Sequence, residues 1–299
     1  MTQQAGYSSN TTLAAIADRL REANSILIGT HVKPDGDAIG STLALARALR
    51  RLGKEITVVH HGPWSHRFDP YLGDIEIMHH EGQGELPETD AIVITDTGAW
   101  SQLTRLKHHL EPRRDKTIVI DHHRHGSDSS AWRFVEPEAS AVCEPLARLC
   151  KLLLEVERLP VEIAEPLYFG IATDTGWFRF NSVRPETFQL AAEFIAAGVD
   201  QSALYRHIEQ GDEVPSLILL RKALDSMELL NDNGSALMLL TQRDIKEAKA
   251  EPDDTTGLID VPQRVRAIRV VCLVVELRPD LTKISLRSKP GDQPDEPFV

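Results

Sequence analysis

Three short segments rich in aspartate and histidine, far apart along the chain, constrain its fold more than any other feature. They read His31-Val-Lys-Pro-Asp35-Gly-Asp37, Asp121-His122-His123 and Thr173-Asp174-Thr175-Gly176. Each follows an apolar run that is typical of a strand or a buried helix, so each lies where a packed scaffold can hold it. Asp96 ends another such run. Together these segments supply the carboxylates and imidazoles that a two-metal hydrolytic site needs.

Short apolar strands alternate with helices over the first two thirds of the chain. We expect strands at 26–28, 56–59, 91–95 and 117–120, and helices at 38–52, 143–155, 161–173, 185–197 and 201–210. This alternation predicts an α/β fold with a parallel sheet. Ligands bind beyond the carboxyl ends of the strands in such sheets. The aspartates that fall just past predicted strand ends should therefore meet on one edge; they are Asp35, Asp37, Asp96 and Asp121.

We expect two domains. Residues 1–197 form the parallel-sheet domain with the acidic segments, 198–230 a helical connector, and 231–299 a smaller C-terminal α+β domain. The smaller domain is expected to contain a strand at 236–241, a helix at 242–250 and an antiparallel pair of strands at 267–277 and 283–287. We place the active-site cleft between the two domains.

The proposed ligands favour a hard divalent cation. Carboxylate oxygens suit Mn²⁺ and Mg²⁺, and the imidazoles fit Mn²⁺ better than Mg²⁺. Gly36, between Asp35 and Asp37, is expected to let the backbone turn tightly. The isolated Asp96 suits a carboxylate that bridges two ions. Any one of these aspartates could instead cap a helix or a turn, but capping does not explain all of them beside two histidines.

Composition excludes several classes of protein. The formal charge of −12 over 299 residues argues against binding to long duplex nucleic acid, which needs many basic contacts. Three cysteines are too few for a disulfide framework. No apolar run is long enough to span a bilayer, and the first residues do not read as a secretory signal, so we expect a cytoplasmic protein without a membrane partner.

Further histidines and aromatics carry weaker signals. The pairs His60-His61, His79-His80 and His108-His109 are interpreted as surface or loop imidazoles. Trp177, Phe178 and Phe180 follow Asp174; they could stack on a base, although packing behind the acidic segments is the favoured interpretation.

These motifs resemble those of the DHH phosphoesterase superfamily. The resemblance is carried by the His31/Asp35/Asp37 segment, by Asp96-Thr97, by Asp121-His122-His123 and by the segment from Gly170 to Gly176. Their order and spacing are most similar to the NrnA branch, whose members degrade short oligonucleotides and dephosphorylate 3′-phosphoadenosine 5′-phosphate. The match covers about residues 25–290.

The resemblance implies a role for each matching residue. His31, Asp35 and Asp96 would hold one Mn²⁺, and a second ion would be held by Asp37, Asp96, His122 and Asp174, with Asp96 as the bridge. The implied catalytic pair is His123, which would face the substrate phosphate, and Asp121, which would orient the neighbouring imidazoles. Arg287 and Ser288 would bind substrate from the smaller domain.

The end of the chain departs from the family pattern. NrnA-like proteins continue to a Gly-Gly-Gly-His motif that helps to grip the nucleotide, whereas this sequence runs Lys289-Pro290-Gly291 and ends at Val299 without it. We therefore expect an intact metal centre beside an incomplete, apparently truncated substrate-binding domain.

The sequence thus predicts a Mn²⁺-dependent phosphoesterase that hydrolyses short oligonucleotides from an end, or 3′-phosphoadenosine 5′-phosphate, through a metal-activated water. Its partners would be short oligonucleotides or nucleotide phosphates, and a homodimer is compatible with the sequence. Two alternatives stay open. One is another hydrolase of the superfamily, a cyclic-dinucleotide phosphodiesterase or an inorganic pyrophosphatase. The other is a regulatory protein that binds nucleotides without hydrolysing them.

Overall fold

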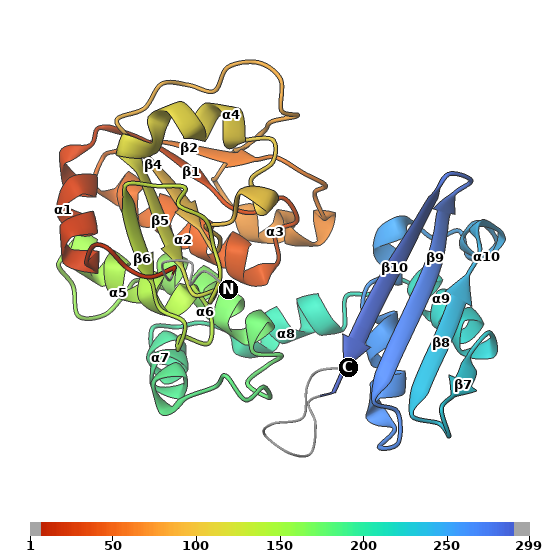
Figure 1. Ribbon diagram of the computed structural model, residues 1–299. Coiled ribbons are helices and arrows are strands. Elements are labelled where there is room, and N and C mark those ends of the chain that lie inside the picture. The colour runs from red at the N-terminus through yellow and green to blue at the C-terminus, as the bar shows by residue number, and fades with distance from the viewer. Residues whose placement is uncertain (1–6, 290–299) are drawn as a thin grey trace, which may run out of the picture. The chain divides into compact units, whose positions relative to one another are not determined.

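The computed structural model describes residues 7–289. The chain divides into two compact units, Met1–Leu204 and Tyr205–Val299. Each unit has its own sheet (Figure 1).

A six-stranded parallel sheet forms the centre of the first unit. Its strands lie in the order β3-β2-β1-β4-β5-β6, and every neighbouring pair is parallel. Their bounds are β1 Ser25–Gly29, β2 Glu55–His60, β3 Ile77–His79, β4 Ala91–Thr95, β5 Thr117–Asp121 and β6 Trp132–Val135. The direction in which strands are added reverses between β1 and β4. Such a switch point is where open α/β sheets bind their ligands.

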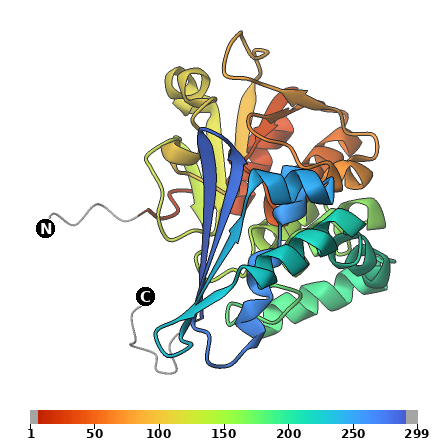
Figure 2. The same cartoon turned by 90° about the vertical axis from the view of Figure 1, so that its right-hand side faces the viewer.

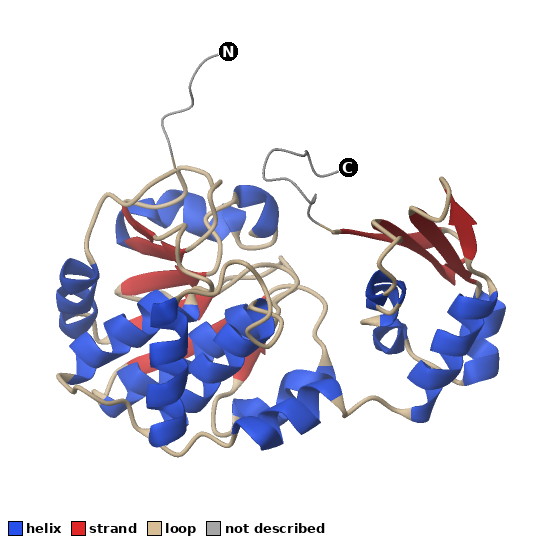
Figure 3. Ribbon diagram, turned by 90° about the horizontal axis from the view of Figure 1, so that it is seen from below, coloured by secondary structure: helices blue, strands red, loops and turns tan. Residues whose placement is uncertain are grey.

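Helices cover both faces of this sheet (Figures 1 and 3). The helices of the first unit are α1 Leu13–Glu22, α2 Gly36–Arg51, α3 Asp69–Leu72, α4 Lys107–Leu110, α5 Cys143–Leu154, α6 Val161–Asp174, α7 Pro185–Ala196 and α8 Gln201–Glu209, of which α8 runs past the division between the units. Helices α1, α2, α5 and α6 pack on one another in a single layer. The opposite face is covered by the α4 region, where a buried cluster consists of Leu27, Val59, Leu86, Ile92, Ile94, Leu103, Leu106, Leu110 and Val119. Burial on both faces explains why the central strands β1, β4 and β5 are almost entirely apolar.

Glycines allow α2 and α6 to pack with their backbones almost in contact. A Cβ on Gly40 would lie 2.2 Å from the carbonyl oxygen of Pro166, and a Cβ on Gly36 would lie 2.1 Å from the hydroxyl of Thr173. Gly36 is the first residue of α2 and does not have a positive φ. Its absent side chain is therefore needed for this close approach, and not for the tight turn that we expected.

The second unit is a four-stranded mixed sheet with helices on one face (Figure 3). Its elements are α9 Val214–Asp225, β7 Glu228–Leu230, β8 Ser235–Leu240, α10 Gln242–Ala248, β9 Val270–Arg278 and β10 Leu281–Ser288. The strand order is β10-β9-β8-β7; β8 and β9 are parallel and the outer pairs are antiparallel. Strands β9 and β10, the blue pair in Figure 2, run side by side. Short 3₁₀ helices lie in both units. Those of the first unit are His66–Phe68, Trp100–Gln102 and Glu111–Lys116, and those of the second are Pro252–Thr255, Leu258–Asp260 and Pro262–Arg264.

The predicted fold class is confirmed: a parallel α/β unit is followed by a smaller unit with its own sheet. The expected antiparallel pair corresponds to β9 and β10. Helix α9 lies inside the span expected to be a connector, yet its Leu219 and Ala223 are buried in the core of the second unit. Strands β3 and β6, at the two edges of the large sheet, were not predicted. Among the described residues, no helix combines the length and the apolar character needed to cross a bilayer.

The close approach of α2 and α6 predicts that Gly40→Ala destabilises the protein. In an ordinary helix interior this substitution adds roughly 0.5–1 kcal/mol of stability. Here the added methyl meets a backbone carbonyl, so we expect a net loss of about 1–3 kcal/mol, the range for an overpacked core. Urea unfolding followed by circular dichroism measures the difference, and a variant at least as stable as the parent would contradict the packing argument.

Candidate metal centre

The residues proposed as ligands converge at the switch point of the large sheet. His31 follows β1, Asp96 follows β4, and Asp121 is the last residue of β5. Asp37 lies in the first turn of α2, and Asp174 ends α6. Segments up to 143 residues apart in the sequence are thus brought to one edge, as the positions of the predicted strand ends indicated.

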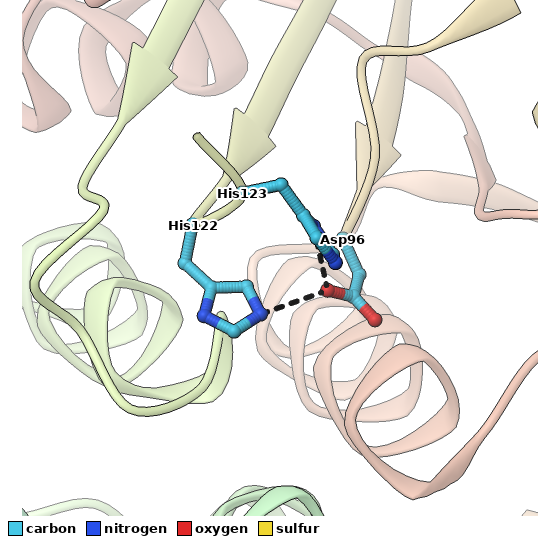
Figure 4. Close-up of side chains that lie close together, drawn as sticks. All are labelled: Asp96, His122 and His123. Carbon is cyan, nitrogen blue, oxygen red and sulfur yellow. Dashed lines mark ion pairs between the residues drawn. The ribbon is translucent and has the colours of Figure 1, made fainter. Parts of the chain in front are cut away.

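Asp96 occupies the middle of the group. Its carboxylate is only 3% exposed. The Nε2 atom of His31 lies 3.3 Å from one oxygen, Oδ2, and the Nε2 atom of His122 lies 3.5 Å from the other, Oδ1. The Nδ1 atom of His123 is 3.8 Å from Oδ1 (Figure 4). Each oxygen of this carboxylate therefore lies near at least one imidazole nitrogen.

The six proposed ligands fall into two sets of side chains. In each set the ligand atoms lie within 4.8 Å of one another, as a shared cation requires. One set contains His31, Asp35 and Asp96, and the other contains Asp37, His122 and Asp174. Asp96 also groups with His122 and His123, so it adjoins both sets. The structure brings together every residue that was predicted to hold a metal; the ligand assignment itself stays a prediction.

Local backbone structure fixes the aspartates. Asp96 has a φ of 62°, in the left-handed region that aspartate tolerates better than most residues. Asp35 caps α2, since its Oδ1 accepts hydrogen bonds from the amides of Asp37 and Ala38 at 3.1 Å. The two oxygens of Asp37 accept the amides of Val142 and Cys143, where α5 begins. Helix N-termini favour nearby negative charge, so they help to hold these carboxylates.

The crowded charges shift the protonation of the site strongly. Burial raises the pKa of Asp37, and the charges of Asp96 and Asp174 raise it further. Burial likewise raises the pKa of Asp174 to about 6. Burial alone would lower the pKa of His122, but its pairing with Asp96 and the charge of Asp37 raise it to about 10. The protein by itself thus lacks enough positive charge at this edge to balance its carboxylates. The raised pKa values of Asp37, Asp174 and His122 mean that bound protons compensate for this deficit.

The donor set fits a divalent cation. Among the described residues, no donor forms a hydrogen bond with the buried Oδ1 of Asp96, although imidazole nitrogens lie on that side. The Nδ1 atom of His122 is 3.1 Å from the carbonyl of Ala139. This bond places the proton of a neutral imidazole on Nδ1 and leaves Nε2 as a free ligand atom, the arrangement found in metal-binding histidines. A buried carboxylate oxygen without a donor and an imidazole presenting its lone pair are both completed by a cation.

The Asp-His-His segment is organised by its first residue. Asp121 is fully buried. Its Oδ1 accepts the backbone amides of His122 and His123 and the Nδ1 proton of His123, the last at 2.7 Å. The half-exposed ring of His123 therefore directs Nε2 away from Asp121. The other oxygen of Asp121 accepts the hydroxyl of Tyr7 at 2.6 Å, a contact that the sequence did not predict. Burial and the charge of Asp121 raise the pKa of Tyr7, so this hydroxyl stays protonated and donates.

His61 is a second residue that sequence reasoning missed. Its side chain is 1% exposed, and its Nε2 lies 2.8 Å from the carbonyl of Thr30, directly before His31. It therefore holds the loop that carries a proposed ligand. The histidine pairs were interpreted as surface or loop imidazoles. His61 and His80 do lie in loops, but four members are buried and not on the surface: His60, His61, His80 and His109. Two consecutive histidines after an apolar run resemble a surface loop, and no local signal marks the carbonyl that His61 meets.

The proposed substrate residues of the second unit lie on β10. The side chain of Arg287 is 59% exposed, and its Nε is 3.7 Å from a carboxylate oxygen of Asp260. Ser288 pairs with Val270 of β9. Their role toward substrate stays a prediction. The segment from Pro290 onward, where the departure from the Gly-Gly-Gly-His pattern was noted, lies outside the described residues.

Comparison with protein families and curated proteins gives consistent matches. Residues 25–171 match the model of the DHH family, N-terminal domain. The chain is 34% identical over 268 residues to the bifunctional oligoribonuclease and PAP phosphatase NrnA of Thermus thermophilus, covering 89% of this chain and 76% of that protein. It is 25% identical over 270 residues to the protein of the same name from Bacillus subtilis, covering 89% and 82%.

Solved structures repeat the fold. An exopolyphosphatase-related protein from Bacteroides fragilis superimposes with a TM-score of 0.86 at 27% identity, covering 93% of this chain and 83% of that one. The exonuclease RecJ, in a structure bound to manganese, gives a TM-score of 0.53 at 17% identity, covering 94% and 83%, and so shares the fold alone.

If Asp96 adjoins both ion positions, Asp96→Asn should weaken both at once. We expect the parent protein to bind two Mn²⁺ per chain, and the variant to lose more than the roughly 10–100-fold affinity that follows loss of an outer-sphere partner. Isothermal titration with Mn²⁺ measures affinity and stoichiometry. Asp90→Asn is the matched control, because Asp90 precedes the same strand at its opposite end and accepts the amides of Asn24 and Ser25. Two ions bound with parental affinity by the Asp96 variant would exclude the bridge.

The raised pKa of His122 predicts that metal binding releases protons. At neutral pH this imidazole is protonated, because its pKa is about 10, and it must lose the Nε2 proton before it can ligate. Affinity for Mg²⁺ should therefore rise as pH increases from 7 to 9, by about tenfold per unit for one released proton. Titrations in two buffers with different ionisation enthalpies count the protons. Affinity that does not change over this range would rule out displacement of a proton from His122.

Proposed function

The chain belongs to the DHH family and is a metal-dependent phosphoesterase, and from this premise we propose that it hydrolyses short oligonucleotides from an end and removes phosphate from 3′-phosphoadenosine 5′-phosphate. The observation that carries the proposal is the pair of ligand sets that meet at the buried Asp96. A buried carboxylate that belongs to one set and also groups with His122 of the other, beside a half-exposed histidine, is an arrangement suited to hydrolysing a phosphate ester.

The proposed holders of the ions are His31, Asp35 and Asp96 on one side and Asp37, His122 and Asp174, with Asp96, on the other. Two divalent ions, Mn²⁺ by the carboxylate and imidazole chemistry of the set, would acidify a water and neutralise charge on the phosphoryl oxygens. The two ring nitrogens of His122 and of His123 have separate roles in this scheme. In His122 and His123, Nδ1 is fixed by a protein oxygen, which leaves Nε2 for the site.

His123 is the residue that would touch the substrate. Its ring is half exposed, and its Nδ1 proton is committed to Asp121. The hydrogen bond to Asp121 raises the pKa of His123 and so favours the protonated ring, whose Nε2–H would donate a hydrogen bond to the substrate phosphate. This contact strengthens as negative charge builds up on the phosphoryl group during attack by water, so it lowers the barrier as well as aiding binding. Asp121 acts through this imidazole by fixing its orientation.

The net charge of the protein bears on the size of the substrate, and the exposed ring of Phe180 bears on its chemistry. The net charge of −12 disfavours long polyanions, whose affinity depends on many basic contacts. Phe180 leaves 55% of its surface exposed, six residues after Asp174, and its ring covers Gly176. An aromatic face in this position could stack on a base. Phe178, in contrast, packs against Tyr168 and Phe188, in line with the favoured interpretation of internal packing.

A cyclic-dinucleotide phosphodiesterase is the competing function. The cyclic-di-AMP phosphodiesterase PdeA of Listeria monocytogenes is 22% identical over 293 residues, but this chain spans only 42% of its length. The NrnA proteins match over most of their own length, which favours the linear substrates.

The test is a substrate panel assayed with the parent and with Asp37→Ala. With Mn²⁺ we expect the parent to release mononucleotide from a dinucleotide and phosphate from 3′-phosphoadenosine 5′-phosphate, and to do so faster than it cleaves cyclic dinucleotide or pyrophosphate. Chelator should abolish turnover. Asp37→Ala should reduce it by several orders of magnitude, because the variant loses a carboxylate of the second ligand set. Asp90→Asn should retain activity.

Each contrary result has a clear meaning. Full turnover by Asp37→Ala would refute the metal assignment. Tight nucleotide binding by the parent without hydrolysis in Mn²⁺ would favour a regulatory protein. Preferential cleavage of the cyclic dinucleotide would replace the proposed substrate class.

A further inference from the structure

The segment before α1 is bound along the edge of the large sheet. Ser9 exchanges hydrogen bonds with Val135 through its hydroxyl, which donates to the carbonyl at 3.0 Å and accepts the amide at 2.8 Å. The Asn10 amide donates to the carbonyl of Arg133 at 2.9 Å, and the Asn10 side chain accepts the Arg133 amide at 2.7 Å. These bonds satisfy backbone groups of the edge strand β6 and hold Tyr7 in a defined place.

Two glycines make room for the ring of Tyr7. A Cβ on Gly98 would lie 2.0 Å from the Tyr7 hydroxyl, and a Cβ on Gly126 would lie 2.3 Å from the ring. Neither glycine has a positive φ, so steric space and not backbone conformation explains the absence of a side chain. The guanidinium of Arg133 lies over the ring, 5.3 Å from its centre. The loops after β4 and β5, which carry Asp96 and the Asp-His-His segment, therefore both contact this single side chain.

The hydroxyl of Tyr7 completes the hydrogen bonding of Asp121. One oxygen of that carboxylate accepts three donors from the two residues that follow it, and the other accepts Tyr7 at 2.6 Å. With both oxygens held, the buried carboxylate cannot rotate without losing a charge-assisted hydrogen bond. The oxygen that receives the Nδ1 proton of His123 is thereby kept in place.

We propose that Tyr7 is a positioning residue for the hydrolytic reaction: its hydroxyl locks Asp121, and Asp121 in turn holds the Nδ1–H of His123, so that the ring presents its Nε2–H to the substrate phosphate. This inference rests on the proposed function through the role given to His123. Tyr7 touches no ligand atom and no substrate in this scheme. Its effect is carried entirely by the orientation of one imidazole.

The first test is Tyr7→Phe, which removes the hydroxyl and keeps the ring between its glycines. With a dinucleotide and Mn²⁺ we expect kcat to fall by roughly 10–100-fold, the usual effect of losing a residue that orients a site histidine. KM should change much less, because the binding surface is intact. Tyr71→Phe is the matched control: it removes a tyrosine hydroxyl from a ring that is 9% exposed and stacks on Phe169. It should leave kcat unchanged.

The second measurement needs no turnover. In Mg²⁺-loaded protein with ¹⁵N-labelled histidine, NMR detects the protons on Nδ1 and Nε2 separately, and His123→Ala identifies the His123 signals. We expect a slowly exchanging Nδ1 proton on His123 in the parent, and faster exchange of that proton in Tyr7→Phe. Gly98→Ala adds a methyl group that would collide with the Tyr7 hydroxyl and displace it from Asp121, so it should have the same effect on the His123 signals.

The two measurements separate the possible failures. If the parent hydrolyses nothing in the panel, the proposed function fails, yet the NMR result still decides whether Tyr7 orients His123. If Tyr7→Phe keeps parental kcat and an unchanged His123 spectrum, the positioning role is overturned. The role is also overturned if kcat falls while the His123 signals stay the same. In a His123→Ala background, Tyr7→Phe should cause no additional loss, and an additive loss would show that Tyr7 acts by another route.

Discussion

Repulsion among the four carboxylates proposed as ligands, collected at one edge of a sheet, is the constraint on which the rest of the first unit depends. Asp37 and Asp96 are almost completely buried, where an uncompensated charge is very costly. Two kinds of compensation are built into the chain. Imidazoles flank Asp96, and the amides at the start of α5 bind Asp37. A divalent cation held by the proposed ligands would supply the charge that these groups do not.

The carboxylates of the site can be held close together only by a rigid support. Hydrogen bonds among buried hydroxyls, backbone carbonyls and a histidine provide part of it. Below Asp96, the buried hydroxyl of Ser41 lies 3.0 Å from that of Thr95, and Thr30 donates to the Thr95 carbonyl at 2.9 Å, so that α2, β4 and the loop after β1 are tied together. His61 holds the Thr30 carbonyl from the other side. The glycine contacts between α2 and α6 allow Asp37 and Asp174, on different helices, to reach the same place. The catalytic edge is thus fixed by packing against neighbours and not by the ligands alone.

Sequence reasoning succeeded where the signal is local and failed where it is not. The central strands are buried on both faces and therefore appear as continuous apolar runs, and an aspartate that ends such a run must lie at the edge of the sheet. These two facts were enough to bring Asp35, Asp37, Asp96 and Asp121 together. Edge strands β3 and β6 are short and only partly buried, with Trp132 and Arg133 in the latter, so their pattern is weak. Tyr7 and His61 act on carboxylate and carbonyl groups 114 and 31 positions away, and nothing in the neighbouring sequence marks such partners.

The binding of residues 8–10 along β6 has a consequence for how the protein is made. Tyr7 leaves the ribosome long before Asp121, and closing a loop of that length costs conformational entropy that only a formed sheet edge repays. The arm must therefore wait until β5 and β6 have been added to the sheet. During synthesis Tyr7 therefore emerges well before it can reach Asp121, and its contact with the site forms only once the strand that ends at Asp121 and the edge strand β6 are in place.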